Sequence, residues 1–186
     1  PENKKNIRRL ISYYKDHIEK HPNITVIKET ADFDTIVAGH YDVCISAIGG
    51  NPRHLNVQGI DNEMVINAMD YLDDVKVNGK EVVVIGGGIT GAETALELHG
   101  EGKKVAIIEM ADQFLAQQSN ACQAYNIAIS QTDIKIKTGL RLLSVGDKEI
   151  TLVDRFGNEQ TMACDNVVIA AGFVSNDSLY ERLYNE

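Results

Sequence analysis

The sequence lacks paired cysteines, an excess of basic charge and long apolar runs, and each absence excludes a class of protein. The cysteines are three in number, are far apart and form no CxxC pair: Cys44, Cys122 and Cys164. That spacing argues against a redox dithiol or a zinc knuckle. A net charge of −9 argues against nucleic acid or an anionic membrane as the main partner. No apolar run has the length of a membrane span, and no signal-peptide pattern is present. We therefore expect a cytoplasmic protein with reduced thiols.

Helical and strand patterns alternate along the chain. The first 50 residues predict a helix over 7–18, a strand over 24–28, a short helix over 32–40 and an apolar strand over 42–50. Further strands are predicted over 81–85, 104–109, 134–139 and 165–172. Further helices are predicted over 65–74, directly after the strand at 81–85, over 118–131, and at the end of the chain. Residues 141–164 predict a β-meander with turns at Gly146 and Gly157. The segments "YDVCISAIGG" and "CDNVVIAAGF" share one design, in which an aspartate precedes an apolar strand that ends in small residues. Either segment alone is equally well explained as a buried strand that ends in a turn.

The segment "VVVIGGGITGAETALEL" joins a strand to a helix through glycines. Gly86, Gly88 and Gly91 match GxGxxG, a pattern that is informative only when a strand precedes it and a helix follows it. Gly86 permits the tight turn, Gly88 lets a pyrophosphate approach the backbone, and Gly91 lets the helix pack close to the strand. The N–H groups near Ile89 and Thr90 at the helix start are suited to binding phosphates.

The next strand, "KVAIIE", ends in Glu109, which is an acid at the spacing expected for hydrogen bonds to the adenosine ribose. A 2′-phosphate beside this carboxylate would be repelled by about 1–4 kcal/mol. The residues that follow, Met110 to Gln113, include no base, and Lys103 and Lys104 lie at the other end of the strand. The sequence therefore predicts NAD(H) rather than NADP(H). It also predicts an α/β fold, a Rossmann-like doubly wound parallel sheet with a β-meander and a partial second α/β lobe.

The segment "VVVIGGGITGAETALELHGEGKKVAIIEM" resembles the NAD(P)H-binding domain of the two-dinucleotide-binding flavoproteins. Within that group the chain is most similar to the 2,4-dienoyl-CoA reductase and 2-enoate reductase type of NADH:flavin oxidoreductase. The resemblance covers nearly the whole chain, including "YDVCISAIGGNPRHLNVQGID" and "CDNVVIAAGFVSNDSL". It implies a partial FAD-binding lobe over 1–61, an NAD-binding domain over 62–180 and the start of a return to the FAD lobe over 181–186.

The same resemblance implies a set of cofactor-binding residues. Glu93 lies where the superfamily has a glutamate near the nicotinamide, although a surface carboxylate in the first helical turn explains it equally well. Gly172, and by the same likeness Gly139, match glycines that flank the nucleotide. Ala171 and Met110 complete the expected set. No catalytic side chain and no metal ligand are expected, because hydride transfer is the chemistry of the cofactors.

The chain departs from that family in ways that indicate a fragment. The upstream GxGxxG and the downstream Gly-Asp motif of the FAD domain are not in the sequence, and Ala47-Ile48-Gly49 replaces the usual Ala-Thr-Gly. We expect FAD, FMN and an iron–sulfur cluster in the parent protein, whose remaining FAD and FMN-barrel domains would be partners, but no tight FAD binding by this piece, which by itself would be inactive. The parent would reduce an activated C=C bond of an enoate or enoyl-CoA. Two alternatives remain: an NAD(H)-sensing regulatory domain, or the NADH domain of another electron-transfer flavoprotein reductase.

Overall fold

The computed structural model describes residues 5–185 and divides the chain into two compact units. One unit comprises residues 51–174, and the other comprises residues up to 50 together with those from 175 onward. The chain passes twice between the units, and the two passages pair as the strands β1 (Gly50–Pro52) and β10 (Phe173–Ser175). The identification of the units as NAD-binding and FAD-binding lobes stays a prediction.

The unit of residues 51–174 is built on a five-stranded parallel sheet. Its strands, in spatial order, are β2 (Val65–Asn67), β9 (Asn166–Ile169), β3 (Glu81–Ile85), β4 (Lys104–Ile108) and β5 (Lys135–Lys137). The helices α3 (Ala68–Leu72), α4 (Ile89–Gly100) and α5 (Asn120–Ser130) connect them. This arrangement confirms the predicted Rossmann-like α/β class. Residues 65–67, which the sequence assigned to a helix, instead form β2 ahead of α3.

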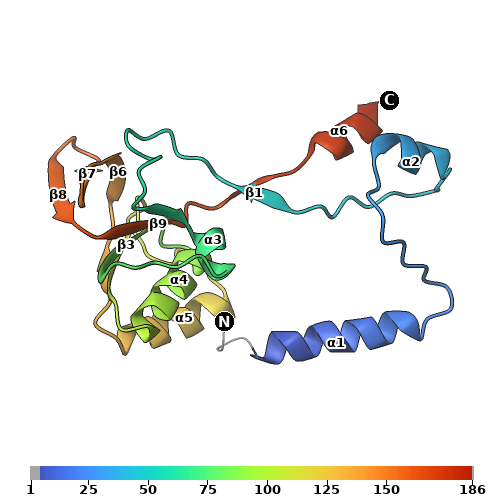
Figure 1. The fold of residues 1–186 in the computed structure, drawn as a ribbon, viewed down its shortest axis with the longest axis horizontal. Helices are drawn as coiled ribbons and strands as arrows, with labels where there is room; N and C mark the ends of the chain where they lie inside the picture. The colour runs from blue at the N-terminus through green and yellow to red at the C-terminus, as the bar shows by residue number, and fades with distance from the viewer. Residues whose placement is uncertain (1–4, 186) are drawn as a thin grey trace. The chain divides into compact units, whose positions relative to one another are not determined.

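The apolar run of β3 is explained by burial on both faces of the sheet. Val82 and Val84 face the core that includes Leu98 of α4, whereas Val83 and Ile85 face the core that includes Leu152. The second core belongs to an antiparallel sheet of β6 (Leu140–Val145), β7 (Glu149–Asp154) and β8 (Glu159–Ala163), which confirms the predicted meander. Figure 1 shows α4 and α5 on one side of the parallel strands and β6 to β8 on the other. A strand between two such layers needs apolar residues at every position.

The other unit contains helices but no buried core among its described residues. Its helices are α1 (Lys5–Glu19), α2 (Phe33–Ala38) and α6 (Ser178–Asn185), as the sequence predicted. The strands predicted over 24–28 and 42–50 are wrong, because residues 24–28 and 42–49 have no strand pairing. The side chains of Val43 and Ile45 are 76% and 86% exposed. An apolar segment becomes a strand only where a neighbouring strand takes its hydrogen bonds, and the described part of this unit offers none.

Candidate functional site

The glycine turn between β3 and α4 forms one wall of the candidate site. Gly86 has φ +112°, and its N–H donates to the Ile108 carbonyl at 2.8 Å. A Cβ at Gly86 would overlap the carbonyl of Ala170, and a Cβ at Gly91 would overlap the carbonyl of Gly86. The tight turn predicted at Gly86 and the close helix packing predicted at Gly91 are therefore confirmed.

Gly88 differs from these two glycines because it faces open space. No heavy atom lies within 4 Å of the position that its Cβ would occupy. Gly88 is also the N-cap of α4 and, having no side chain, makes no capping hydrogen bond. The first N–H groups of a helix have no partner within the helix, so Ile89 and Thr90 begin a helix end that is suited to an anion. The pyrophosphate-binding role of these residues stays a prediction, and the open backbone at Gly88 fits it.

Glu109 lies beside the glycine turn, where two backbone N–H groups hold its carboxylate. Gly87 donates to Oε2 at 2.6 Å, and Ala111 donates to Oε1 at 2.7 Å. A carboxylate has about four lone-pair sites, so both oxygens can still accept hydrogen bonds from ribose hydroxyls. Because both contacts are with the main chain, the carboxylate is oriented before any ligand binds.

Gly87 is a residue of the candidate site that the sequence reasoning missed. A Cβ at this position would lie 2.9 Å from the Glu109 Cβ and 3.0 Å from Cδ2 of Phe114. Any larger residue would therefore displace the side chain of the acid. The only signal in the sequence is that three glycines are consecutive, whereas GxGxxG requires only two of them.

Glu93 lies inside the protein rather than on the helix surface. Glu93 is 6% exposed and lies in a stretch of α4, residues 91–95, that is buried at every position. The interpretation of Glu93 as a surface carboxylate in the first turn is therefore wrong. Burial is costly for a carboxylate that serves only to complement the helix dipole, so the alternative position near a nicotinamide stays as the prediction.

Eight of the eleven predicted residues line three hollows of the 51–174 unit, whereas Gly86, Gly91 and Glu93 line none of them. A cavity of about 170 Å³ includes Gly87, Gly88, Ile89, Glu109 and the buried Cys122 in its lining. A second cavity of about 280 Å³ contains Met110 and Gly139, and it shares Ala111 with the first. A crevice of about 10 Å³ contains Thr90, Ala171 and Gly172. Much of this lining follows the carboxyl ends of β3, β4 and β9, which is where ligands bind in open α/β sheets.

Two arginines lie close to the end of β4, although the sequence showed no base there. Arg141 and Arg155 line the cavity that contains Met110 and Asp112. Nη1 of Arg155 is 3.5 Å from Oδ2 of Asp112. Residues 110–113 include no base, as the sequence showed, but the fold brings two arginines from other parts of the chain to the cavity beside them. These arginines come from β6 and the β7–β8 turn, and their approach depends on tertiary structure that local sequence does not encode.

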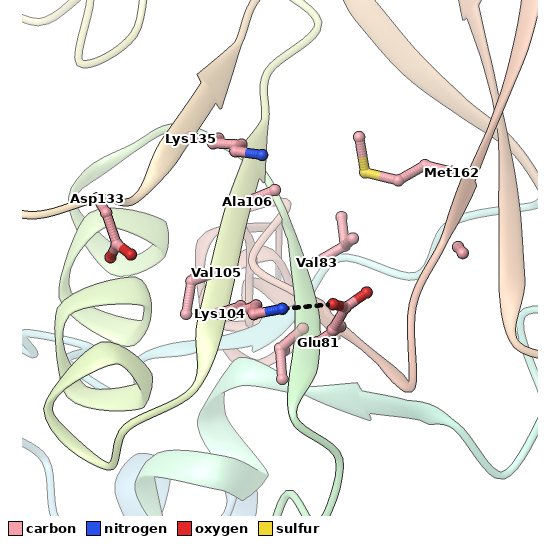
Figure 2. Close-up of a pocket in the computed structure, with 10 residues that line it drawn as sticks. Glu81, Val83, Lys104, Val105, Ala106, Asp133, Lys135 and Met162 are labelled. Atoms are coloured by element: carbon pink, nitrogen blue, oxygen red, sulfur yellow. Dashed lines mark hydrogen bonds and ion pairs between the residues drawn. The ribbon is translucent and has the colours of Figure 1, made fainter.

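A further cavity, of about 400 Å³, lies near the amino ends of β3, β4 and β5 (Figure 2). Glu81 accepts a hydrogen bond from Lys104 at 3.1 Å across it, and Lys135 and Met162 also line it. Its volume is larger, but it lies away from the glycine turn and from Glu109. The position of Lys104 here agrees with the prediction that this lysine lies at the wrong end of the strand for the nucleotide. We therefore place the candidate site at the carboxyl ends of the strands.

Comparison with known proteins identifies the family. The family model of the pyridine nucleotide-disulphide oxidoreductases matches residues 2–186. Cinnamate reductase of Clostridium sporogenes is 29% identical over 98% of this chain and 28% of its own length. NADH oxidase of Thermoanaerobacter brockii is 32% identical over 77% of this chain and 23% of its own length. The structure of 2-naphthoyl-CoA reductase in complex with 2-naphthoyl-CoA superposes with a TM-score of 0.77 at 30% identity, over 94% of this chain and 26% of that protein.

The chain thus spans about a quarter of the length of each of these relatives. No helix in the described range 5–185 is both long and apolar enough to cross a membrane. The match to the family model extends over both units, including the segment around Glu109. The chain belongs to the pyridine nucleotide-disulphide oxidoreductase family, a family of flavin-dependent oxidoreductases that bind FAD and NAD(P)H.

Proposed function

We propose that this chain provides the NADH-binding domain of a flavin-dependent oxidoreductase in which hydride passes from NADH to FAD. The observation that carries the proposal is the Glu109 carboxylate, which the N–H groups of Gly87 and Ala111 hold beside the open N-terminus of α4. A fixed acid and an uncapped helix end are the two groups that an adenosine ribose and a pyrophosphate require.

Each group has a distinct role in binding. The first N–H groups of α4 donate to the pyrophosphate, and the missing side chain of Gly88 lets the phosphates approach them. Glu109 accepts hydrogen bonds from the ribose hydroxyls. The remaining predicted residues flank the nucleotide: Glu93, Met110, Gly139, Ala171 and Gly172. The bound NADH supplies the hydride and FAD accepts it, so this chain contributes position and electrostatics rather than an acid or a base.

The preference for NADH over NADPH follows from the charge of Glu109. Its carboxylate is fixed by the main chain and cannot easily move away from a 2′-phosphate. The repulsion at contact distance is about 1–4 kcal/mol, depending on the local dielectric. NADH, which has a 2′-hydroxyl, donates a hydrogen bond at the same place.

The parent protein, on this proposal, reduces an activated C=C bond of an enoate or enoyl-CoA. Similarity to cinnamate reductase and to 2-naphthoyl-CoA reductase supports this substrate class. Residues 1–61 would then form part of an FAD lobe, residues 62–180 the NADH domain, and residues 181–186 the return to the FAD lobe. FMN and an iron–sulfur cluster would be held by the rest of the parent. The described cysteines Cys44, Cys122 and Cys164 form no CxxC pair, and two of them are buried, which disfavours disulfide reduction by this part of the chain.

Calorimetric titration with NADH and with NADPH tests the nucleotide part of the proposal. We expect the wild-type chain to bind NADH more tightly than NADPH. We expect Glu109→Ala to weaken NADH binding about tenfold or more, because it removes hydrogen bonds between a charged acceptor and the ribose. Glu109→Gln keeps one acceptor oxygen, so its affinity for NADH should lie between those of the wild type and Glu109→Ala.

The matched control is Glu81→Ala, which removes an exposed carboxylate at the opposite end of the neighbouring strand. It should leave NADH binding unchanged, and thermal unfolding should show that all variants are folded. A folded wild-type chain that binds neither nucleotide would contradict the proposal. Equal or tighter binding of NADPH would contradict the NADH preference.

A further inference from the structure

The lining of the cavity beyond the end of β4 has equal numbers of positive and negative side chains. It includes two arginines, Arg141 and Arg155, and two aspartates, Asp112 and Asp154. The Asp154 carboxylate is occupied by the β7–β8 turn, because the N–H groups of Phe156 and Asn158 donate to it at 2.8 Å and 2.9 Å. Asp112 is therefore the acid that faces Arg155, with 3.5 Å between Oδ2 and Nη1.

The segment that carries Asp112 is fixed against the next strand. Leu140 N–H donates to the Glu109 carbonyl at 3.1 Å, and Gly139 N–H donates to the Ala111 carbonyl at 2.9 Å. A Cβ at Gly139 would lie 3.7 Å from Oδ1 of Asp112. Both acids, Glu109 and Asp112, thus extend from one anchored stretch of chain that borders the arginine cavity.

Arg155 also contacts its chain neighbour Phe156, an exposed residue that does not line the cavity. Its guanidinium carbon is 5.0 Å from the centre of the Phe156 ring. The Arg155 side chain is 68% exposed, and a guanidinium has five N–H donors, which is more than the contact with Asp112 uses. An arginine at this place is chemically suited to a phosphate, unless a neighbouring carboxylate offsets its charge.

We propose that Asp112 is a second residue that selects NADH, acting by neutralising Arg155. This inference rests on the proposed function, because it assumes that the adenosine end of the nucleotide lies over Glu109. Glu109 repels a 2′-phosphate, and Asp112 offsets the positive charge of the arginine that would otherwise attract it. The 2′-hydroxyl of NADH carries no charge, so the charges of Asp112 and Arg155 have little effect on its binding.

The experiment compares Asp112→Asn, Arg155→Met and the double variant by titration with NADPH and NADH. We expect Asp112→Asn to tighten NADPH binding about two- to fivefold, the upper part of the range for an exposed charge pair. NADH binding should change less than about twofold, the limit for an exposed group with no role in binding. The gain for NADPH should disappear when Arg155→Met is added, and it should shrink at high salt, because exposed charges are screened.

Asp147→Asn is the matched control, because it makes the same change in net charge in the exposed turn between β6 and β7. Three results would overturn the inference while leaving the NADH-binding proposal intact: unchanged NADPH affinity in Asp112→Asn, an equal gain in the Arg155→Met background, or an equal gain in Asp147→Asn. Absence of NADH binding in the wild-type chain would instead overturn both proposals.

Discussion

Gly88 and Gly91 are three residues apart, but alanine at the two positions should affect stability and NADH binding differently. The Gly91→Ala methyl group would overlap the Gly86 carbonyl, so it should lower the free energy of unfolding by about 1–3 kcal/mol. The Gly88→Ala methyl group would enter open space at a φ of −80°, which alanine adopts freely. It should cost less than about 1 kcal/mol.

For NADH affinity, we expect Gly88→Ala to be the more harmful substitution, although it costs less stability. Gly88→Ala should weaken NADH binding about tenfold or more, because the methyl group occupies the approach to the first N–H groups of α4. Urea unfolding and calorimetric titration of both variants measure the two effects. A stable Gly88→Ala variant with unchanged NADH affinity would contradict the role of Gly88 as a phosphate approach.

The cysteines should differ sharply in reactivity. Burial, followed by the nearby charges of Asp165 and Glu81, raises the pKa of the Cys164 thiol to about 11. Thiolate is the reactive form, so iodoacetamide at pH 8 should modify exposed Cys44 first and Cys164 only after unfolding. Mass spectrometry of timed samples, with a urea-unfolded sample as the control, measures the order. Early modification of Cys164 in the folded protein would contradict its burial.

At the scale of elements, Asp165 joins the start of β3 to the start of β9. Its Oδ2 accepts from the N–H groups of Glu81 at 2.9 Å and Lys80 at 2.8 Å, and its own N–H donates to the Glu81 carbonyl at 2.7 Å. The hydrogen bonds from Glu81 and then Lys80 hold the pKa of this carboxyl below its usual value. The aspartate of "CDNVVIAAGF" thus fixes the register of two neighbouring strands.

This lowered pKa sets the direction of a pH effect. Its contribution to stability is complete above the ordinary aspartate pKa of about 4 and is lost as the pH falls through the lower pKa of the folded state. Asp165→Asn should therefore be less stable than the wild type at pH 7 and should lose less stability between pH 5 and pH 2. Urea unfolding across that range, with Asp147→Asn as the control, measures the difference. An equally steep acid dependence in Asp165→Asn would contradict this assignment.

The elements that sequence predicted well are those that local pattern determines. The strand over 81–85, the helix that starts after Gly88 and the strand that starts at Lys104 all form as expected, because apolar runs and glycines define them within a few residues. The strands predicted over 24–28 and 42–50 fail because strand formation depends on a distant partner.

The same limit explains what was missed at the site. The spacing of Gly86, Gly88 and Glu109 is encoded in one βαβ unit and could be predicted. The position of Arg155 depends on how the meander packs on the parallel sheet, and the burial of Glu93 depends on how the first half of α4 is enclosed by the rest of the unit. Tertiary packing decides both, and a single sequence reports it only indirectly.

For the whole molecule, the core residues are unevenly distributed. Both apolar cores consist of residues between 55 and 171, whereas the described residues of the other unit include no buried side chain. Extended chain with few packed side chains opens readily and is cut readily by proteases. We expect trypsin to cleave first at Lys20 or Lys28 and to leave a resistant fragment that contains β2 to β9.

Mass spectrometry of a limited digest identifies that fragment. A Lys28→Gln variant is the control, because it should redirect the first cut to Lys20 without changing the resistant fragment. A first cut at Lys103, just before β4, or at Lys104, its first residue, would contradict the expected difference in local stability.

The sheet order β2-β9-β3-β4-β5 also determines when the domain can form. A ribosome makes β3 well before β9, although β9 is the strand that lies between β2 and β3. Until residues 166–169 are synthesised, the edge of β3 that β9 will occupy has no native partner. The backbone at Val83 and Val84 then lacks the strand with which it pairs in the fold. The fold therefore cannot close progressively behind the growing chain. β9, the strand between β2 and β3, is the last strand of this sheet to be translated, and a chain that stopped before it would hold an unpaired apolar edge open to aggregation.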